Sequence, residues 1–493
     1  MAMNTQTETF RGYGKALELT HQTAVESKFS GEIETVLSAC AAAVLSGAEA
    51  GNGEVRYFGK VIFSIVYEDN EKRVCRAEKG VEFSQICRDE RISPALTAKA
   101  QIGVENVAVR REGASTVVTA LLGADISLFG ETLLEYLAGG DCVVKRESVP
   151  VYIAHLLSGA TEAEDEFETE FIGDILLHTE SVNVTDVTVE TGTLRAEGEI
   201  NLGILAMKGE GLVSFERLVP FNVEIPCDAA MFGFFGEANV TIGGVALKAE
   251  ADEGRGKCKI TAEFSLTAEG CVYEEASLDA VTDAFSKTNE VTLKYAEGVS
   301  GGAGEIVRLT ERIQSRAALS SPVDFSDTLE AVIEERAEAN LVKGAEGARI
   351  EGVAMATLLV RGADGTRRGV EMSLPFSLPA TVEGEYKVRA FVVGVSARQK
   401  QEGEIDAEAT LKITMQAVIK RPYRIVSGAE EGAPIVERDC GLSVYIPRAG
   451  DGLWELAKRL LKSPEEVSAN NPDLEFPVKE GQRIIIYRRK TLS

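Results

Sequence analysis

The chain has 493 residues, too many for one hydrophobic core, so three or four domains are expected. It has 78 acidic residues against 52 Lys and Arg, which gives a net charge of −26. Because a strongly acidic protein repels phosphate backbones, nucleic acid is not expected as a partner. The sequence contains neither the apolar core of a signal peptide nor an apolar run long enough to span a bilayer. We therefore expect a cytoplasmic protein without a transmembrane segment, its eight cysteines reduced.

One pattern occurs three times between residues 18 and 425. In each copy a glycine begins an alternating apolar strand, and a phenylalanine ends the next strand 23 or 24 residues later. These pairs are Gly59 and Phe83, Gly198 and Phe221, and Gly352 and Phe376. A further phenylalanine (Phe29, Phe171 and Phe325) precedes each glycine by 27 or 30 residues. Such regular intervals indicate one structural unit repeated three times.

Each copy continues with a matching segment, at 104–107, 242–245 and 392–395, then a charged turn and another alternating strand. Alternation of apolar and polar residues is typical of half-buried strands. We therefore predict a mainly β protein with three antiparallel β-sandwich-like domains, at residues 18–158, 165–297 and 305–425.

Two kinds of segment need interpretation within this scheme. Residues 329–341 are rich in helix formers, but the matching residues 181–190 of the second copy are β-branched and alternating, so we predict a strand in both. The acidic run 161–166, the glycine-rich run 298–304 and the polar run 427–434 are interpreted as linkers between domains.

Residues 442–490 predict a separate module with the order strand, helix, helix, strand. A Gly-Asp-Gly turn precedes a helix whose apolar residues are spaced by three and four, and Ser463, Pro464 and Glu466 form a capping box at the start of the second helix. The only tryptophan of the chain, Trp454, lies in the first helix, and we expect it to fill the core of the module.

This module resembles a LysM domain. The resemblance rests on Gly450-Asp451, Leu453-Trp454, Leu456-Ala457, Asn470 with Pro472, and Gly481-Gln482. It implies a non-catalytic module that binds glycans containing N-acetylglucosamine or, in some members, a protein. The implied groove is lined by Gly450, Asp451, Gly452, Leu453, Asn471, Pro472 and Asp473. Gly452 occupies a position where the family usually has Ser or Thr, so the hydroxyl that could meet a sugar is missing.

The triplicated pattern resembles the SPOCS domain of spore coat morphogenetic proteins in endospore-forming bacteria. The resemblance rests on the strand ending at Tyr67, the turn at 68–71, and the Pro-Phe pairs at 220–221 and 375–376; the first copy differs, with Glu82 before Phe83. Three such units followed by one LysM module imply a clostridial coat protein at the forespore surface in the mother cell. In that architecture the LysM module binds the ATPase scaffold of the coat basement layer, or another coat protein.

Nothing in the sequence predicts catalysis, a cofactor or a metal site. The three histidines (His21, His155 and His178) are dispersed, zinc-ligand spacings and nucleophile motifs are missing, and Gly254 to Lys257 is interpreted as a hairpin turn. We therefore expect a non-enzymatic assembly protein. Two alternatives remain: a LysM protein that binds peptidoglycan, and an enzyme whose site is assembled from all three units.

Overall fold

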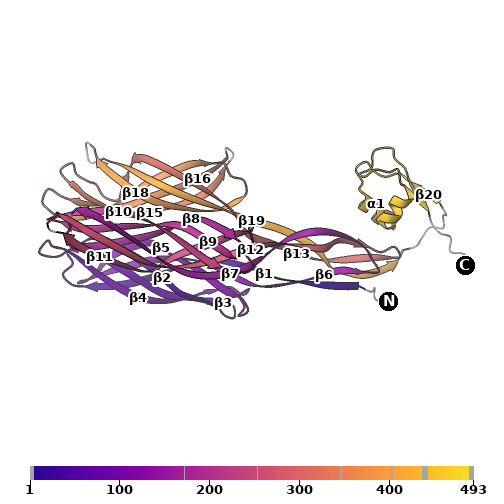
Figure 1. The fold of residues 1–493 in the computed structure, drawn as a ribbon, viewed down its shortest axis with the longest axis horizontal. Helices are drawn as coiled ribbons and strands as arrows, with labels where there is room; N and C mark the ends of the chain where they lie inside the picture. Colours follow the sequence, from indigo (N-terminus) through magenta and orange to yellow (C-terminus); the bar gives the residue numbers. More distant parts are fainter. Residues whose placement is uncertain are drawn as a thin grey trace.

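The computed structural model describes residues 5–170, 172–252, 254–344, 347–400, 404–435 and 442–487. Within these residues the protein is mainly β, as the alternating pattern predicts, with two short helices. Figure 1 shows a head of packed sheets, a narrow stalk of long strands, and a small module beside the end of the stalk. Phe171, Cys440 and residues 488–490 of the predicted module lie outside the described residues.

The first unit contains six strands in two sheets. The strands are β1 (Thr5–Ser30), β2 (Thr35–Ala50), β3 (Glu54–Glu68), β4 (Val74–Arg88), β5 (Thr97–Glu112) and β6 (Ser115–Gly140). One sheet has the order β1-β6-β5 and the other β2-β3-β4. Alternate residues of both sheets, among them Tyr57, Phe63 and Leu122, meet in one buried core.

The second unit repeats this topology. Its strands are β7 (Val143–Glu170), β8 (Ile175–Glu190), β9 (Thr193–Lys208), β10 (Gly211–Pro226), β11 (Phe235–Asp252) and β12 (Lys257–Phe285). The sheets have the orders β7-β12-β11 and β8-β9-β10, and Leu194, Ile200 and Phe264 lie in the core between them. Gly254 to Gly256 form the turn between β11 and β12, as predicted.

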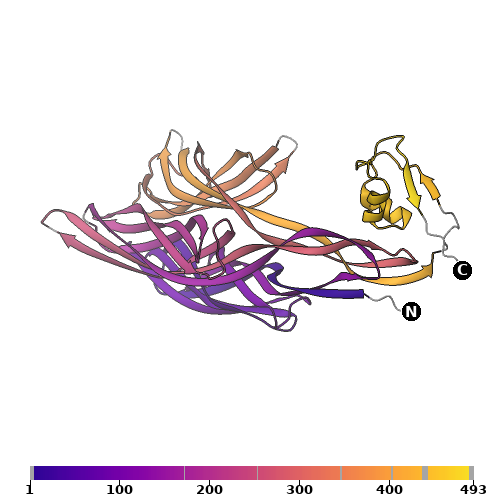
Figure 2. The same cartoon turned by 45° about the vertical axis from the view of Figure 1, so that its right-hand side comes forward.

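The third unit has the same topology with one short additional strand. Its strands are β13 (Asn289–Arg316), β14 (Ala318–Leu319), β15 (Thr328–Gly344), β16 (Gly347–Arg361), β17 (Arg367–Ala380), β18 (Glu385–Gln399) and β19 (Ile405–Pro434). The sheets have the orders β13-β19-β18 and β14-β17-β16-β15. Figure 2 shows this unit, in orange, packed against the other two.

The repeated glycine and phenylalanine are direct cross-strand partners in all three units. Gly59 pairs with Phe83, Gly198 with Phe221 and Gly352 with Phe376. A Cβ atom at Gly198 or Gly352 would lie 2.4 or 2.5 Å from the partner ring, so the ring occupies the space above the glycine. This pairing explains the constant interval in the sequence, because an aromatic ring covers the backbone that glycine leaves bare.

The helix formers at 329–341 do form a strand, as the repeat predicts. They lie in β15, which pairs with β16 along its length. Packing therefore overrides local propensity in this segment. The leading phenylalanines are not equivalent, however: Phe29 is buried at the end of β1, whereas Phe325 lies in a turn and is 73% exposed.

The prediction of three linkers is wrong, because all three runs are parts of long strands. The acidic run 161–166 lies in β7 and pairs with β12, and its charged residues alternate with the inward-facing Ala163 and Phe167. The run 427–434 lies in β19.

The glycine-rich run 298–304 lies in β13, and its glycines allow close packing rather than flexibility. A Cβ at Gly298 would lie 2.3 Å from the hydroxyl of Tyr423, and one at Gly302 would lie 3.2 Å from the ring of Tyr273. Aromatic side chains of neighbouring strands thus pack directly on this backbone.

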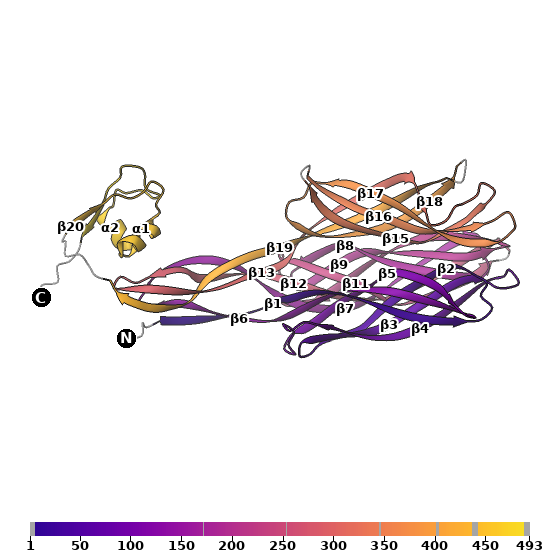
Figure 3. The same ribbon diagram turned by 180° about the vertical axis from the view of Figure 1, so that it is seen from behind.

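The stalk consists of the parts of six strands that extend beyond the sandwiches: β1 with β6, β7 with β12, and β13 with β19 (Figure 3). Its interior is built in layers to which all three units contribute. One layer contains Leu134, Leu278 and Ile425, and the next contains Leu137, Val281 and Val426.

The three units also meet in the head, at an apolar junction and a buried ionic cluster. Leu37, Leu205 and Leu359, one from each unit, share one cluster. Beside it the guanidinium of Arg367 donates hydrogen bonds to Glu330 (2.7 Å), to Glu68 of the first unit (3.4 Å) and to the carbonyl of Glu210 in the second.

Candidate ligand-binding groove of the C-terminal module

The C-terminal module has the predicted order of elements. These are β20 (Leu442–Tyr445), α1 (Leu453–Leu460), α2 (Pro464–Asn470) and β21 (Ile484–Tyr487), with β20 and β21 antiparallel. Leu456, Ala457, Val467 and Ile484 form its buried core. The predicted capping box is present: the Ser463 hydroxyl accepts a hydrogen bond from the Glu466 N–H and the Glu466 carboxylate accepts one from the Ser463 N–H, both 3.3 Å.

The turn that forms one side of the predicted groove is held by Asp451. Its carboxylate accepts a hydrogen bond from the N–H of Arg448 (2.9 Å) and pairs with Arg459 of α1 (2.6 Å). Arg459 and the Arg448 N–H hold the pKa of Asp451 below its usual value. Gly450 has φ of +91°, which a residue with a side chain rarely adopts. Asp451 therefore holds the shape of this turn, and its charge is already paired.

The loop on the other side is held by Asn471. Its side-chain N–H groups donate to the carbonyls of Val467 (2.9 Å) and Ile485 (3.1 Å), and its oxygen accepts a hydrogen bond from the Ile485 N–H (2.7 Å). The amide thus joins the end of α2 to β21. Its hydrogen bonds are made within the module, and a ligand would have to compete with them.

The remaining predicted lining residues differ in exposure. Gly450, Pro472 and Asp473 are exposed, while Gly452 and Leu453 are half-buried. Leu453 packs against the module core, as does Leu474 from the opposite loop. Gly452 is the N-cap of α1 and makes no side-chain hydrogen bond there. The free part of the lining is therefore the rim at Pro472 and Asp473.

Trp454 is predicted from the sequence to fill the module core, and in the structure it does more than that. It packs against that core, but it also contacts the stalk: its Nε1–H donates a 2.8 Å hydrogen bond to Asp283 of β12, and its ring meets Phe285 edge-on at 5.3 Å. Lys458 pairs with Asp283 (2.6 Å) and Lys287 with Glu466 (3.0 Å). The module is therefore docked on the end of the stalk, and Pro472 and Asp473 face solvent.

The charge of the module contrasts with that of the body. Residues 442–493 carry 9 Lys and Arg against 7 acidic residues, whereas the preceding 441 residues carry 43 against 71. Among the described residues no group of three or more His, Cys, Asp and Glu is arranged to hold a metal ion, and no helix is long and apolar enough to cross a membrane.

Comparison with known proteins returns nothing similar. No protein-family model matches the chain, and neither does any curated protein or solved structure. The functional argument therefore depends on the residues and geometry of this chain.

Proposed function

We propose that the protein is a non-enzymatic assembly protein that presents its C-terminal module to a protein partner. The observation that carries the proposal is the position of the module: it is held at the end of a stalk, beyond the head, with Pro472 and Asp473 exposed. The stalk, with apolar layers to which all three units contribute, separates this rim from the acidic head.

The groove chemistry favours protein over glycan as the partner. Sugar recognition requires side-chain donors and acceptors aimed at hydroxyl groups. Here the carboxylate of Asp451 and the amide of Asn471 are engaged inside the module, and Gly452 has no hydroxyl. An extended protein segment could instead contact the exposed rim through backbone and apolar groups.

The resemblances to LysM and SPOCS domains suggest which partner this is. We propose a spore coat or envelope protein of a Clostridia-type cell, with the module docked on the ATPase scaffold of the coat basement layer at the forespore surface. Recovery of that ATPase by the full chain from sporulating mother cells tests the proposal. Asp473→Lys should reduce recovery, whereas Glu250→Lys, an equal charge change on exposed β11, should not.

The glycan alternative is tested in parallel by sedimentation with purified peptidoglycan. Gly452→Ser supplies the missing hydroxyl. The backbone there has φ of −81°, which serine adopts readily, and the atom nearest to the new Cβ is in the carboxylate of Glu455, the end of a flexible side chain that can move aside. We expect the wild-type chain not to sediment. Strong sedimentation that chitooligosaccharides compete away would contradict the protein-partner proposal.

A further inference from the structure

A cavity of about 2220 Å³, partly open to solvent, lies between the three units of the head. Six strands line most of it: β2 and β5, β8 and β11, and β15 and β18. Each is an edge strand of its sheet, so the same two strands of every unit face the cavity. On the side of the stalk the cavity ends at Phe129, Leu156 and Cys271. On the side of the apolar junction of the head it ends at Cys40.

Corresponding residues of the three units form a polar ring in this cavity. The strands β5, β11 and β18 carry a β-bulge at equivalent points, starting at Val104, Ile242 and Val392. Three residues before each bulge lie Gln101, Asn239 and Arg389, and all three line the cavity. The ring thus has two amides and one guanidinium at equivalent places.

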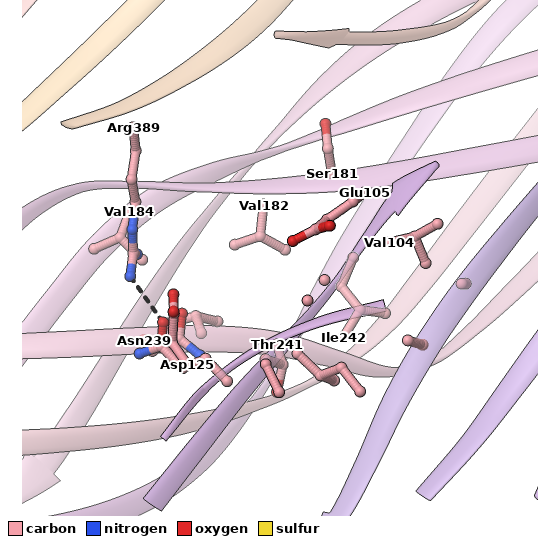
Figure 4. A pocket seen from close by; sticks show the side chains of 18 of the residues that line it. Val104, Glu105, Asp125, Ser181, Val182, Val184, Asn239, Thr241, Ile242 and Arg389 are labelled. Carbon is pink, nitrogen blue, oxygen red and sulfur yellow. Dashed lines mark hydrogen bonds between the residues drawn. The ribbon is translucent and has the colours of Figure 1, made fainter. Parts of the chain in front are cut away.

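The residues paired with this ring in the neighbouring strands are Asp125, Glu269 and Thr414, which also line the cavity. Figure 4 shows Arg389 pointing toward Asn239 and Asp125, with a dashed line for the hydrogen bond of Arg389. That bond is donated to the oxygen of Gln101 at 3.0 Å. The neutral amide satisfies one of the five N–H groups of the guanidinium and none of its charge.

Most charges around the ring are paired with each other. Lys99 pairs with Glu269 (2.7 Å), Lys387 with Glu18 (3.3 Å), and Lys15 with both Glu18 (2.7 Å) and Glu237 (3.7 Å). Among the described residues, Arg389 and Asp125 have no ion-pair partner within 4 Å, and the side chains of Asp125 and Asn239 make no hydrogen bond. At the ring itself, one positive and one negative group are therefore left without an ion pair. Elsewhere on the cavity wall, the side chains of Glu78, Glu105, Glu334, Glu335, Arg336 and Glu338 also have no ion pair among the described residues.

Arg389 and Asp125 are both exposed, and both line the cavity. Desolvation by the surrounding protein lowers the pKa of Arg389, and the charges of Glu237 and Asp125 oppose that effect only in part. The charges of Arg389 and Asp125 are each free to pair with a ligand group of opposite sign.

Apolar side chains form part of the wall next to the ring. Val184 of β8 lies beside Arg389, and Val182 lies farther along the same strand (Figure 4). Val104 and Ile242, at the start of two bulges, also line the cavity, farther from Arg389. A ligand held by the polar ring would therefore place an aliphatic group against these side chains.

We propose that this ring is a binding site for a small zwitterion, an α-amino acid with an aliphatic side chain. Its carboxylate would take the free N–H groups of Arg389 and its ammonium group would meet Asp125, while Asn239 can serve either group. An anion alone would leave Asp125 unpaired, and a cation alone would leave Arg389 unpaired. The proposal is independent of the function proposed for the C-terminal module.

Calorimetric titration of the full chain with L-leucine and L-valine tests the site. At least one of them should bind. Two analogues of leucine separate the charges: 4-methylpentanoate lacks the ammonium group and isoamylamine lacks the carboxylate. Each should bind at least about tenfold more weakly, because one charge-assisted hydrogen-bonded contact is lost.

Variants locate the binding. Arg389→Gln and Asp125→Asn should each weaken it at least about tenfold. Lys387→Gln is the matched control: it removes a charge two residues away on β18, but one that is already paired with Glu18, so affinity should be kept. The proposal is overturned if neither amino acid binds at millimolar concentration, if an analogue binds wild-type protein as tightly as leucine, or if both variants bind as wild type does.

Discussion

The indole N–H of Trp454 donates a hydrogen bond to the carboxylate of Asp283, a residue of the stalk that precedes it by 171 positions. This contact and the ion pair of Asp283 with Lys458 join the module to the body. Since Trp454 is the only tryptophan, its fluorescence reports directly on docking.

Asp283→Ala should release the module. The change removes the acceptor for Trp454 and the partner of Lys458, so the indole becomes more exposed and its emission should shift to longer wavelength. Asp279→Ala, on the same strand and 72% exposed in its pair with Arg146, serves as control and should leave the emission unchanged. An unchanged spectrum in Asp283→Ala would contradict the docked arrangement.

Docking should weaken in acid. Burial alone would raise the pKa of Asp283, but Lys458 and Trp454 outweigh it and lower the pKa below its usual 3.8. The carboxylate of Asp283 therefore has a lower pKa in the docked state than in the released state. The free energy that favours docking is lost as the pH falls from about 3.8 through the lowered pKa, because the carboxylate then takes up a proton. Trp454 emission should shift to longer wavelength over that range in wild type and not in Asp283→Asn.

Glu335→Gln should stabilise the head at neutral and alkaline pH. Burial first, and then the neighbouring Glu216, raise the pKa of Glu335 well above its usual 4.5. The folded state keeps a proton that the unfolded chain releases above pH 4.5, so wild-type stability falls as the pH rises from there. The gain in melting temperature should therefore be larger at pH 8 than at pH 5. Glu338→Gln, exposed on the same strand, should show no such difference.

Arg367→Ala should be strongly destabilising, by about 3–5 kcal/mol, because it leaves the buried carboxylates of Glu68 and Glu330 without their partner. Chemical denaturation followed by circular dichroism measures the loss. Arg312→Ala breaks a pair with Glu408 in which the arginine is 72% exposed, and it should cost no more than about 1 kcal/mol. Equal effects of the two changes would refute a buried role for Arg367.

Asn471→Ala should destabilise the module by about 2 kcal/mol, because the hydrogen bonds that join α2 to β21 are lost. Denaturation followed by Trp454 fluorescence detects this. Asp473→Ala, at the exposed rim, should change stability by less than about 0.5 kcal/mol. If Asn471→Ala weakens partner binding, the lower stability of the module explains the loss. If an Asp473 variant weakens partner binding, the loss shows that the partner contacts the rim.

Several features could be predicted from the sequence because neighbouring residues determine them. Alternation along a strand predicts the strands, even at 329–341, where comparison between copies corrects the helix propensity. The constant interval between glycine and phenylalanine reflects their direct pairing across two strands. The capping box at Ser463 needs only three residues. The acidic run 161–166 contains a single apolar residue, Ala163, so its strand follows from the pairing with β12 rather than from alternation.

Tertiary structure alone decided how these elements are joined in space. The stalk layers, the junction at Arg367 and the ring of Gln101, Asn239 and Arg389 each bring together residues from three units more than a hundred positions apart. The role of Trp454 is of this kind: its apolar neighbours predict burial, but not that Asp283 would accept its N–H. Local sequence sets periodicity and caps, whereas packing between distant strands sets which polar groups find partners and which are left facing a cavity.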